Sequence, residues 1–136
     1  MAKIKPNDAC PCGTGRKVKK CCGPLHRGVK TAASPEALMR SRYTAYALGL
    51  VDYVIDTTHP EHPAWSADRA TWAAELQQWC DDTTFTKLTV HGTGEEGDEG
   101  WVSFTADYDT AGRTGAIAEL SRFAKVDGRW LYRDKK

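Results

Sequence analysis

The spacing of hydrophobic residues changes from a helical to a strand period after Asp81-Asp82. Before this point, apolar side chains recur every three or four positions, as they do on the buried face of an amphipathic helix. After it, apolar and polar residues alternate, and Thr, Val and aromatic residues are frequent, as in half-buried strands. Helices followed by antiparallel strands predict an α+β fold, in which about three helices pack on one face of a curved sheet of about four strands.

The first predicted helix begins at Pro35, which follows Ser34 as a suitable N-cap. It runs to about Leu48, because Gly49 can adopt the left-handed conformation that ends many helices. Residues spaced by three and four positions mark its buried face, with Arg42 at the border of that face: Met39, Tyr43, Tyr46 and Leu50.

Two more helices are expected before the strands. A short one runs from Val51 to about Thr57 and ends before the proline-bounded loop that begins at His59. The other begins near Ser66 or Asp68. We interpret its apolar residues at i, i+4 and i+7 as a core stripe rather than as part of a ligand site: Trp72, Leu76 and Trp79.

Four strands are predicted in the second half of the chain: Thr83–His91, Gly100–Asp109, Thr114–Val126 and Arg129–Arg133. Asp127-Gly128 lies between the last two and is typical of a two-residue hairpin turn. Residues 94–100 are rich in glycine and acidic residues, so we expect them to form a solvated hairpin tip that does not pack.

Residues 1–30, here called the arm, follow neither period and hold four of the five cysteines. These four lie within thirteen residues, and Gly13 and Gly15 can turn the backbone so that the thiols converge. This spacing predicts one structural zinc ion with four cysteine ligands: Cys10, Cys12, Cys21 and Cys22. The arm has few large apolar side chains, so we expect it to be disordered without the metal.

The charge distribution also divides the chain at residue 30. Residues 1–30 carry eight Lys and Arg and one acidic residue, whereas residues 31–136 carry eleven Lys and Arg and seventeen acidic residues. The net charges are therefore +7 and −6, although the whole chain is close to neutral at +1. We predict two units, a zinc-binding arm at residues 1–30 and an α+β domain at residues 31–136.

Four basic residues lie between the two cysteine pairs: Arg16, Lys17, Lys19 and Lys20. Four thiolates around a zinc dication leave a charge of about −2, which nearby cations would balance. Alternatively, these cations form a surface for an acidic partner, which would be a protein, an anionic membrane surface or a nucleic acid. A nucleic acid is the least favoured of these, because the arm has no aromatic residues to stack on bases.

The composition is that of an ordinary globular protein, with 40% hydrophobic and 27% charged residues. No apolar run approaches the roughly 20 residues that span a membrane. The first residues lack the apolar core of a signal peptide, so we expect the protein in the cytoplasm. Thiols stay reduced in that compartment, which favours metal binding over disulfides.

Strand alternation places Glu119 on the same face as two large apolar residues, Ile117 and Phe123. If this face packs against the helices, the buried carboxylate needs a partner, and Arg42 or Arg40 on the first helix is the obvious candidate. In the opposite orientation Glu119 meets water. Alternation alone does not decide between the two.

A pocket beside Glu119 is the candidate site in the domain, with these expected residues: Arg40, Arg42, Tyr43, Tyr46, His59, Glu119, Phe123 and Trp130. There Glu119 could act as acid or base while Arg42 and a tyrosine orient a small apolar or aromatic molecule. The chain lacks a serine nucleophile elbow, a phosphate-binding loop and a histidine pair at helical spacing. Cys80 is better interpreted as a small buried hydrophobe, because the adjacent Asp81 and Asp82 raise the pKa of its thiol.

The stretch from Cys10 to Gly23 resembles the SEC-C zinc motif, which is named after the C-terminal tail of the SecA translocase ATPase. That tail usually ends in Cys-His, so Cys22 stands here in the place of the histidine. The remaining chain resembles the YchJ family of small bacterial proteins, in which a SEC-C motif precedes a nuclear-transport-factor-2-like (NTF2-like) domain. The segments that carry this resemblance are Leu38–Tyr43, Tyr46, Thr58–Pro60, Glu119–Phe123 and Gly128–Tyr132.

The resemblance implies a cone-shaped sheet with Glu119 on its concave face. Some family members carry a second SEC-C cluster at the C-terminus, which this sequence lacks, so we expect a single zinc ion. The fold implies no activity, since it hosts enzymes, binding modules and scaffolds. We therefore consider a zinc-binding adaptor with a small-ligand receptor or scaffold domain, an enzyme that uses Glu119 as acid or base, and a nucleic-acid-binding accessory protein.

Overall fold

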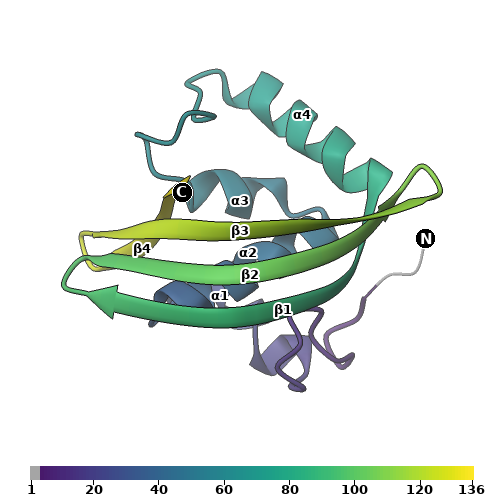
Figure 1. The fold of residues 1–136 in the computed structure, drawn as a ribbon, viewed down its shortest axis with the longest axis horizontal. Coiled ribbons are helices and arrows are strands. Elements are labelled where there is room, and N and C mark those ends of the chain that lie inside the picture. Colours follow the sequence, from purple (N-terminus) through teal and green to yellow (C-terminus); the bar gives the residue numbers. More distant parts are fainter. Residues whose placement is uncertain (1–3) are drawn as a thin grey trace.

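The computed structural model describes residues 4–136 and confirms the α+β fold (Figure 1). The antiparallel sheet has the order β1-β2-β3-β4, formed by β1 (Thr83–Glu96), β2 (Glu99–Thr110), β3 (Arg113–Val126) and β4 (Arg129–Lys135). The three predicted helices are present as α2 (Pro35–Leu48), α3 (Val51–Asp56) and α4 (Arg69–Asp82). The arm contains a 3-10 helix, η1 (Val18–Lys20), and one short helix, α1 (Gly23–His26).

Local capping fixes the ends of the two long helices. The Ser34 hydroxyl accepts a hydrogen bond of 3.1 Å from the N–H of Ala37 at the start of α2. Gly49 ends the helix in the left-handed conformation, with φ of 74°. At the start of α4 the Asp68 carboxylate accepts from the N–H of Thr71 over 3.2 Å. These are short-range interactions, which explains why the sequence predicts the helix ends so well.

The buried face of α2 is wider than its periodicity predicts. Met39 and Tyr43 are buried as expected, but Arg42 is also buried, and Leu50 is exposed. Helix α2 packs against the sheet and also against α3, so that two of its sides are covered. Arg42 lies on the side that α3 covers, where the backbone and hydroxyl groups of α3 and the residues after it accept its hydrogen bonds.

The sheet curves around α2 and α3, which lie on its concave face (Figure 1). Register shifts between Phe85 and Lys87 and between Val90 and Gly92 introduce irregularities into β1, and such bulges bend a strand. The loop after α3 is tied to the far edge of the sheet, because Thr58 forms a parallel bridge with Tyr132 in β4. The curvature leaves room between α2 and the middle of the sheet.

Residues 94–100 form a hairpin tip in which residues 95–99 are exposed, as predicted, but the segment is more regular and packs at Gly100. The two strands continue through most of this segment, and only residues 97–98 form the turn. Gly100 is buried, and a Cβ atom at this position would lie 2.2 Å from a ring carbon of Pro35. The absence of a side chain at Gly100 therefore allows the first turn of α2 to approach the strand. The composition of the segment does not reveal this contact.

The hydrophobic core includes residues of the arm. One buried cluster holds Cys10, Cys12, Val18, Cys22, Leu38, Met39, Tyr43, Val102, Ala106, Phe123 and Trp130. The cysteine-containing segment, purple in Figure 1, thus packs against α2 and the sheet and does not form a separate core.

Candidate functional site

The four clustered cysteines converge on one point. The Sγ atoms of all four lie within 4.8 Å of one another. The Sγ atom of Cys21 lies 3.6 Å from that of Cys12 and 3.9 Å from that of Cys22. In a tetrahedral zinc site with Zn–S bonds of about 2.3 Å, neighbouring sulfur atoms are about 3.8 Å apart. The cysteines therefore fit a zinc ion at their centre.

Short-range hydrogen bonds give this part of the arm its shape. The N–H of Cys10 donates to the carbonyl of Arg16 over 2.8 Å, and the N–H of Gly13 donates to the carbonyl of Cys10 over 3.1 Å. Gly13 and Gly15 have φ angles of 87° and 84°. Glycine adopts this left-handed conformation without strain, and the two turns bring the second cysteine pair back to the first.

The thiols compete with one another for ionisation. Hydrogen bonds from Cys12 and Cys22 lower the pKa of Cys10, while sharing these bonds with Cys10 raises the pKa of Cys12 and of Cys22. A thiolate thus forms at one sulfur at the expense of its neighbours, and a central dication would stabilise all four thiolates. Four thiolate ligands complete the coordination of zinc and leave no open position for a substrate.

Helix α2 contacts the cysteine cluster through polar atoms. The Thr44 hydroxyl lies 3.4 Å from the Sγ atom of Cys10, and both residues are buried. Arg40 donates from Nη1 to the carbonyl of Cys12 and from Nε to Glu36 over 2.9 Å. Arg40 therefore contacts the cysteine cluster and, contrary to the expectation from the sequence, does not line the pocket. Arg40 and Arg42 are two positions apart on a helix with 3.6 residues per turn, so they point to different sides.

His26 fixes the end of the arm to α2. Its Nε2–H donates to the carbonyl of Ser41 over 2.8 Å, and its ring lies 4.8 Å from that of Tyr53, edge to face. Burial lowers the pKa of His26, which favours the neutral ring. Because Nε2 is engaged with α2, this histidine holds the arm in place and lies outside the cysteine cluster.

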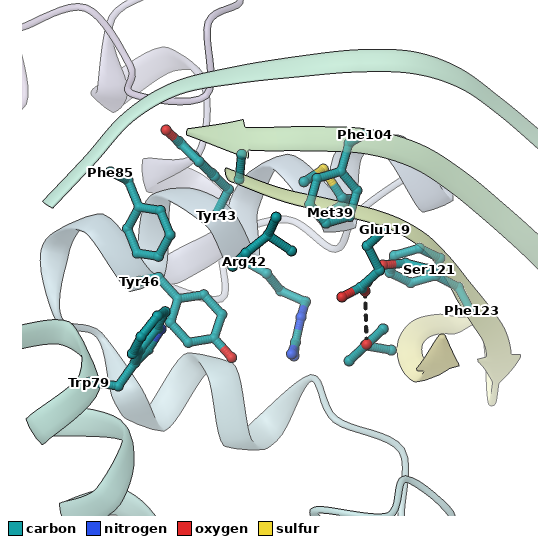
Figure 2. Close-up of a pocket in the computed structure, with 13 residues that line it drawn as sticks. Met39, Arg42, Tyr43, Tyr46, Trp79, Phe85, Phe104, Glu119, Ser121 and Phe123 are labelled. Atoms are coloured by element: carbon teal, nitrogen blue, oxygen red, sulfur yellow. Dashed lines mark hydrogen bonds between the residues drawn. The ribbon is translucent and has the colours of Figure 1, made fainter. Parts of the chain in front are cut away.

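A second site lies between α2 and the concave face of the sheet. It is a cavity of about 180 Å³, and Figure 2 shows side chains of α2, α4 and the strands around it. The lining residues are Met39, Arg42, Tyr43, Tyr46, Trp79, Phe85, Phe104, Ala106, Ile117, Glu119, Ser121, Phe123 and Tyr132. Most of the residues that line the cavity are apolar, and the few polar side chains lie together at one side.

The structure selects one of the two orientations that the sequence left open for β3. Glu119, Ile117 and Phe123 face the cavity together with Ser121. Opposite them in the ladder, Phe104 pairs with Glu119, and Ala106 pairs with Ile117. Glu119 therefore lies on the concave face, within an apolar surround.

The predicted pairing of Glu119 with an arginine is not formed. The Oε2 atom of Glu119 accepts hydrogen bonds from the Ser121 hydroxyl and, over 2.9 Å, from the Tyr132 hydroxyl. Both donors come from positions close to Glu119 in the sheet, whereas the hydrogen bonds of Arg42 go to α3 and the two residues after it. Burial, followed by the nearby Glu119 carboxylate, raises the pKa of Tyr132, which keeps its hydroxyl protonated.

Arg42 is held by neutral groups. Its Nη1 atom donates to the carbonyl of Val54 over 2.9 Å and to the hydroxyls of Thr57 and Thr58 over 2.7 Å and 3.2 Å. Its guanidinium carbon lies 4.7 Å from the centre of the Tyr132 ring. Burial raises the pKa of Tyr46, which also lines the cavity.

Five of the eight residues expected in the pocket line it: Arg42, Tyr43, Tyr46, Glu119 and Phe123. Arg40 faces the cysteines, as described above. The His59 ring faces its own loop, where Nδ1 accepts from the backbone N–H of Glu61 over 3.0 Å. Its backbone N–H donates to the carbonyl of Tyr132 in β4 over 2.8 Å. Trp130 is buried and lines a different cavity, between the end of the arm and β4.

Sequence reasoning missed part of the pocket wall. Ser121 shares the face of β3 with Glu119, so alternation could have identified it. The helical period predicts Trp79 in the core, but its side chain is 37% exposed and lines the pocket. Helix α4 packs across the end of the sheet, where Trp79 meets Phe85. Phe104 and Tyr132 come from other strands, and only the pairing of the strands places them beside Glu119.

The four basic residues of the arm are exposed: Arg16, Lys17, Lys19 and Lys20. Within residues 4–136, none of them forms an ion pair with a carboxylate. Over the same residues, no helix has the length and apolar character needed to cross a membrane.

Two family profiles match the chain. The SEC-C motif matches residues 7–24, and the profile described as YchJ, middle NTF2-like domain, matches residues 34–135. A UPF0225 protein of Geobacter sulfurreducens is 44% identical over 128 residues, which cover 92% of this chain and 76% of that protein. A UPF0225 protein of Deinococcus radiodurans is 45% identical over 130 residues, which cover 95% of this chain and 89% of that protein.

The fold is also similar to a solved structure. The solution structure of a SEC-C motif containing protein from Rhodopseudomonas palustris superposes with a TM-score of 0.82 at 39% sequence identity. The match covers 95% of this chain and 98% of that protein. The arm and the domain thus occur together in a known fold.

Proposed function

The chain belongs to the YchJ family, and we propose that it is a cytoplasmic zinc-binding protein that binds a small molecule in the pocket between α2 and the sheet. The observation that carries this proposal is the cavity itself. Its walls are mainly apolar, and its polar groups, Arg42, Glu119 and the Tyr132 hydroxyl, gather at one side. Small-molecule sites have this composition, in which apolar contacts provide affinity and a few polar groups fix the orientation.

The size of the cavity limits the ligand. Its volume is about 180 Å³. An apolar cavity of about 150 Å³ is sufficient to bind benzene. The pocket therefore suits a molecule with one ring and a short polar substituent. An enzymatic role for Glu119 would need its substrate in this same space, so ligand binding is the property to test first.

Zinc has a structural role in this proposal. Cys10, Cys12, Cys21 and Cys22 would hold the ion, and it would supply charge compensation for their thiolates. Because the cysteines belong to the same buried cluster as Met39 and Tyr43, which also line the pocket, the ion would stabilise one wall of that pocket.

The experiment is a titration of the zinc-loaded protein with single-ring probes, followed by two-dimensional ¹H–¹⁵N NMR. We expect shift changes at residues that line the pocket. The variant Ile117→Phe adds volume to the wall and should abolish them, because the ring would occupy the space of the ligand. Ala118→Val is the matched control, since Ala118 is exposed on the other face of the same strand. Binding that survives in Ile117→Phe would contradict the proposal.

The arm favours a second function, as an adaptor for an acidic partner. Its four exposed basic residues are not used in ion pairs within the described chain. An acidic protein surface would be attracted to them, and the attraction would weaken with salt. Replacing Lys17, Lys19 and Lys20 by Glu should remove partners that the unmodified protein captures from cell extract. Capture that is indifferent to this charge reversal would argue against the adaptor.

A further inference from the structure

The polar groups of the pocket are fixed in position and still have unused hydrogen-bonding capacity. Every hydrogen bond of 3.5 Å or less that Arg42 forms within residues 4–136 starts from Nη1, and its Nε and Nη2 donors have no partner within that distance there. The Tyr46 hydroxyl is a neighbouring protein group that interacts with the guanidinium at the cavity. Arg42 is only 7% exposed, and no carboxylate oxygen of the described residues lies within 4.0 Å of it. A guanidinium stays protonated in proteins, so a buried and fixed positive charge borders the cavity without a counter-ion.

Glu119 is the matching group on the sheet side. Both of its hydrogen bonds, from Ser121 and Tyr132, end on Oε2. The other oxygen, Oε1, accepts no hydrogen bond within residues 4–136. Figure 2 shows the carboxylate of Glu119 and the guanidinium of Arg42 directed toward the same part of the cavity, with the Tyr46 hydroxyl beside the arginine. The two charged groups do not form an ion pair with each other, because their nitrogen and oxygen atoms are more than 4.0 Å apart.

We propose that the pocket selects a single-ring molecule whose substituent is uncharged and both accepts and donates hydrogen bonds, as a primary carboxamide does. The carbonyl oxygen of such a group would accept from the free donors of Arg42, and its N–H would donate to Oε1 of Glu119. The ring would lie against the apolar wall that Phe85, Phe104 and Ile117 provide. This inference rests on the proposed function, because it requires that the pocket binds a ligand.

The charges of the pocket exclude the ionised relatives of such a molecule. A carboxylate of the same size would meet the Glu119 carboxylate, and an ammonium group would meet the Arg42 guanidinium. Like charges that are brought together out of water repel each other, which lowers the affinity for a ligand of the wrong charge. An uncharged substituent uses both pocket groups without this repulsion, so the polar end of the ligand, rather than its ring, determines selectivity.

The test uses three probes of nearly equal size: phenylacetamide, phenylacetate and 2-phenylethylammonium. Each is titrated into the zinc-loaded protein near pH 7, and dissociation constants are obtained from the NMR shifts of pocket residues. We expect phenylacetamide to bind at least about tenfold more tightly than either ion. In Glu119→Gln, which keeps the shape of the side chain, phenylacetate should gain about tenfold, and 2-phenylethylammonium should lose affinity, because the carboxylate that Glu119 contributes to the pocket lining is gone.

The outcomes separate the two proposals. If the three probes bind with similar affinities, or if Glu119→Gln leaves their order unchanged, the pocket is a ligand site but the inferred class of ligand is wrong. If none of the probes shifts pocket resonances, the pocket does not take single-ring molecules, and the proposed function fails as well. Urea unfolding of Glu119→Gln provides the folding control. Arg42→Lys, which keeps the charge but loses the planar set of donors, should weaken phenylacetamide more than it weakens phenylacetate.

Discussion

Helix α2 contributes residues to two sites, the cysteine cluster and the pocket. The two sites differ in whether their polar atoms are hydrogen-bonded within the protein. Arg40, Ser41 and Thr44 contact the arm with its cysteine cluster, whereas Arg42 and Tyr43 line the pocket. Residues three and four positions apart share a side of a helix, so a single helix can serve both sites.

The cysteine cluster is closed and the pocket is open. Around the cysteines, the polar atoms of Arg40, Thr44 and His26 contact groups of the protein itself. In the pocket, Arg42 and Glu119 each have one atom engaged by the protein and other atoms that face the cavity. A saturated set of contacts stabilises a fold, while unused donors and acceptors beside a cavity are available to a ligand. The difference indicates that the cysteine cluster stabilises the fold and that the pocket is the place to test for ligand binding.

The largest expected effect is the loss of a cysteine ligand. Cys22 is buried in the cluster, and Cys22→Ser should remove zinc and with it the order of the arm. Structural zinc contributes on the order of 10 kcal/mol of apparent binding energy in small domains, so a loss of several kcal/mol in unfolding free energy is expected. Metal analysis and urea unfolding measure the two effects.

Cys80→Ser is the matched control for this change. Cys80 lies outside the cluster near the end of α4, where burial raises the pKa of its thiol to about 11. Its replacement should leave zinc content at one ion per chain and change stability by less than about 1 kcal/mol. Equal effects of the two substitutions would show that the cluster has no special role in stability.

An intermediate effect, on zinc affinity, is expected when the contact between α2 and the cysteine cluster is removed. Thr44→Val removes the hydroxyl beside the Cys10 sulfur while keeping the shape of the side chain. Groups that contact metal ligands typically change metal affinity by about 10-fold to 100-fold when they are replaced, and we expect the lower end of this range. Competition with a chelator of known affinity measures the change.

Thr14→Val removes a similar contact between a hydroxyl and a cysteine sulfur at an exposed position, and so tests whether the burial of the Thr44 contact matters for zinc affinity. The Thr14 hydroxyl lies 3.1 Å from the Sγ atom of Cys21, but at the exposed side of the cluster. Water can replace the lost hydroxyl there, so zinc affinity should fall less than in Thr44→Val. A larger loss in Thr14→Val would mean that docking on α2 does not support the cluster.

The smallest expected effect is a pH dependence of folding stability that comes from His26, which holds the arm on α2. Burial lowers the pKa of His26 in the folded protein from its ordinary value of 6.5. As the pH falls through 6.5, the unfolded chain therefore takes up the proton before the folded protein does, and stability is lost. Above that pH the histidine is neutral in both states and contributes no pH dependence.

His26→Gln isolates this contribution, because the amide can still donate to the carbonyl of Ser41 but does not titrate. The stability of the unmodified protein should drop more than that of His26→Gln between pH 7.5 and 5.5, a range of about one pH unit either side of the histidine pKa. Parallel curves for the two proteins would contradict the prediction.

The elements of the fold could be predicted because short-range interactions determine them. Ser34 and Gly49 fix the ends of α2 through contacts within a few residues. Asp127-Gly128 closes the last hairpin, where Asp127 has a positive φ of 51° and Gly128 one of 80°. The spacing of the cysteines, with two glycines between the pairs, likewise contains the information that brings the thiols together.

The candidate pocket could be predicted only in part. Alternation grouped Glu119 with Phe123 on one face of β3 but could not say which face meets the helices, because a strand with a period of two has two equivalent sides. The sequence also suggested an arginine as partner of Glu119, whereas the nearest donors come from Ser121 in the same strand and Tyr132 in the next one. Nothing in the sequence spacing relates Tyr132 to Glu119.

The sequence by itself therefore determined the helices, the strands and the convergence of the four cysteines, since each depends on residues that are close along the chain. The tertiary structure alone decided that the cysteines pack into the core of the domain, that Arg42 is held by the α3 region, and that Trp79 lines the pocket. These arrangements depend on which surfaces of distant segments meet. Such contacts are set by the packing of the whole molecule, and local sequence patterns do not record them.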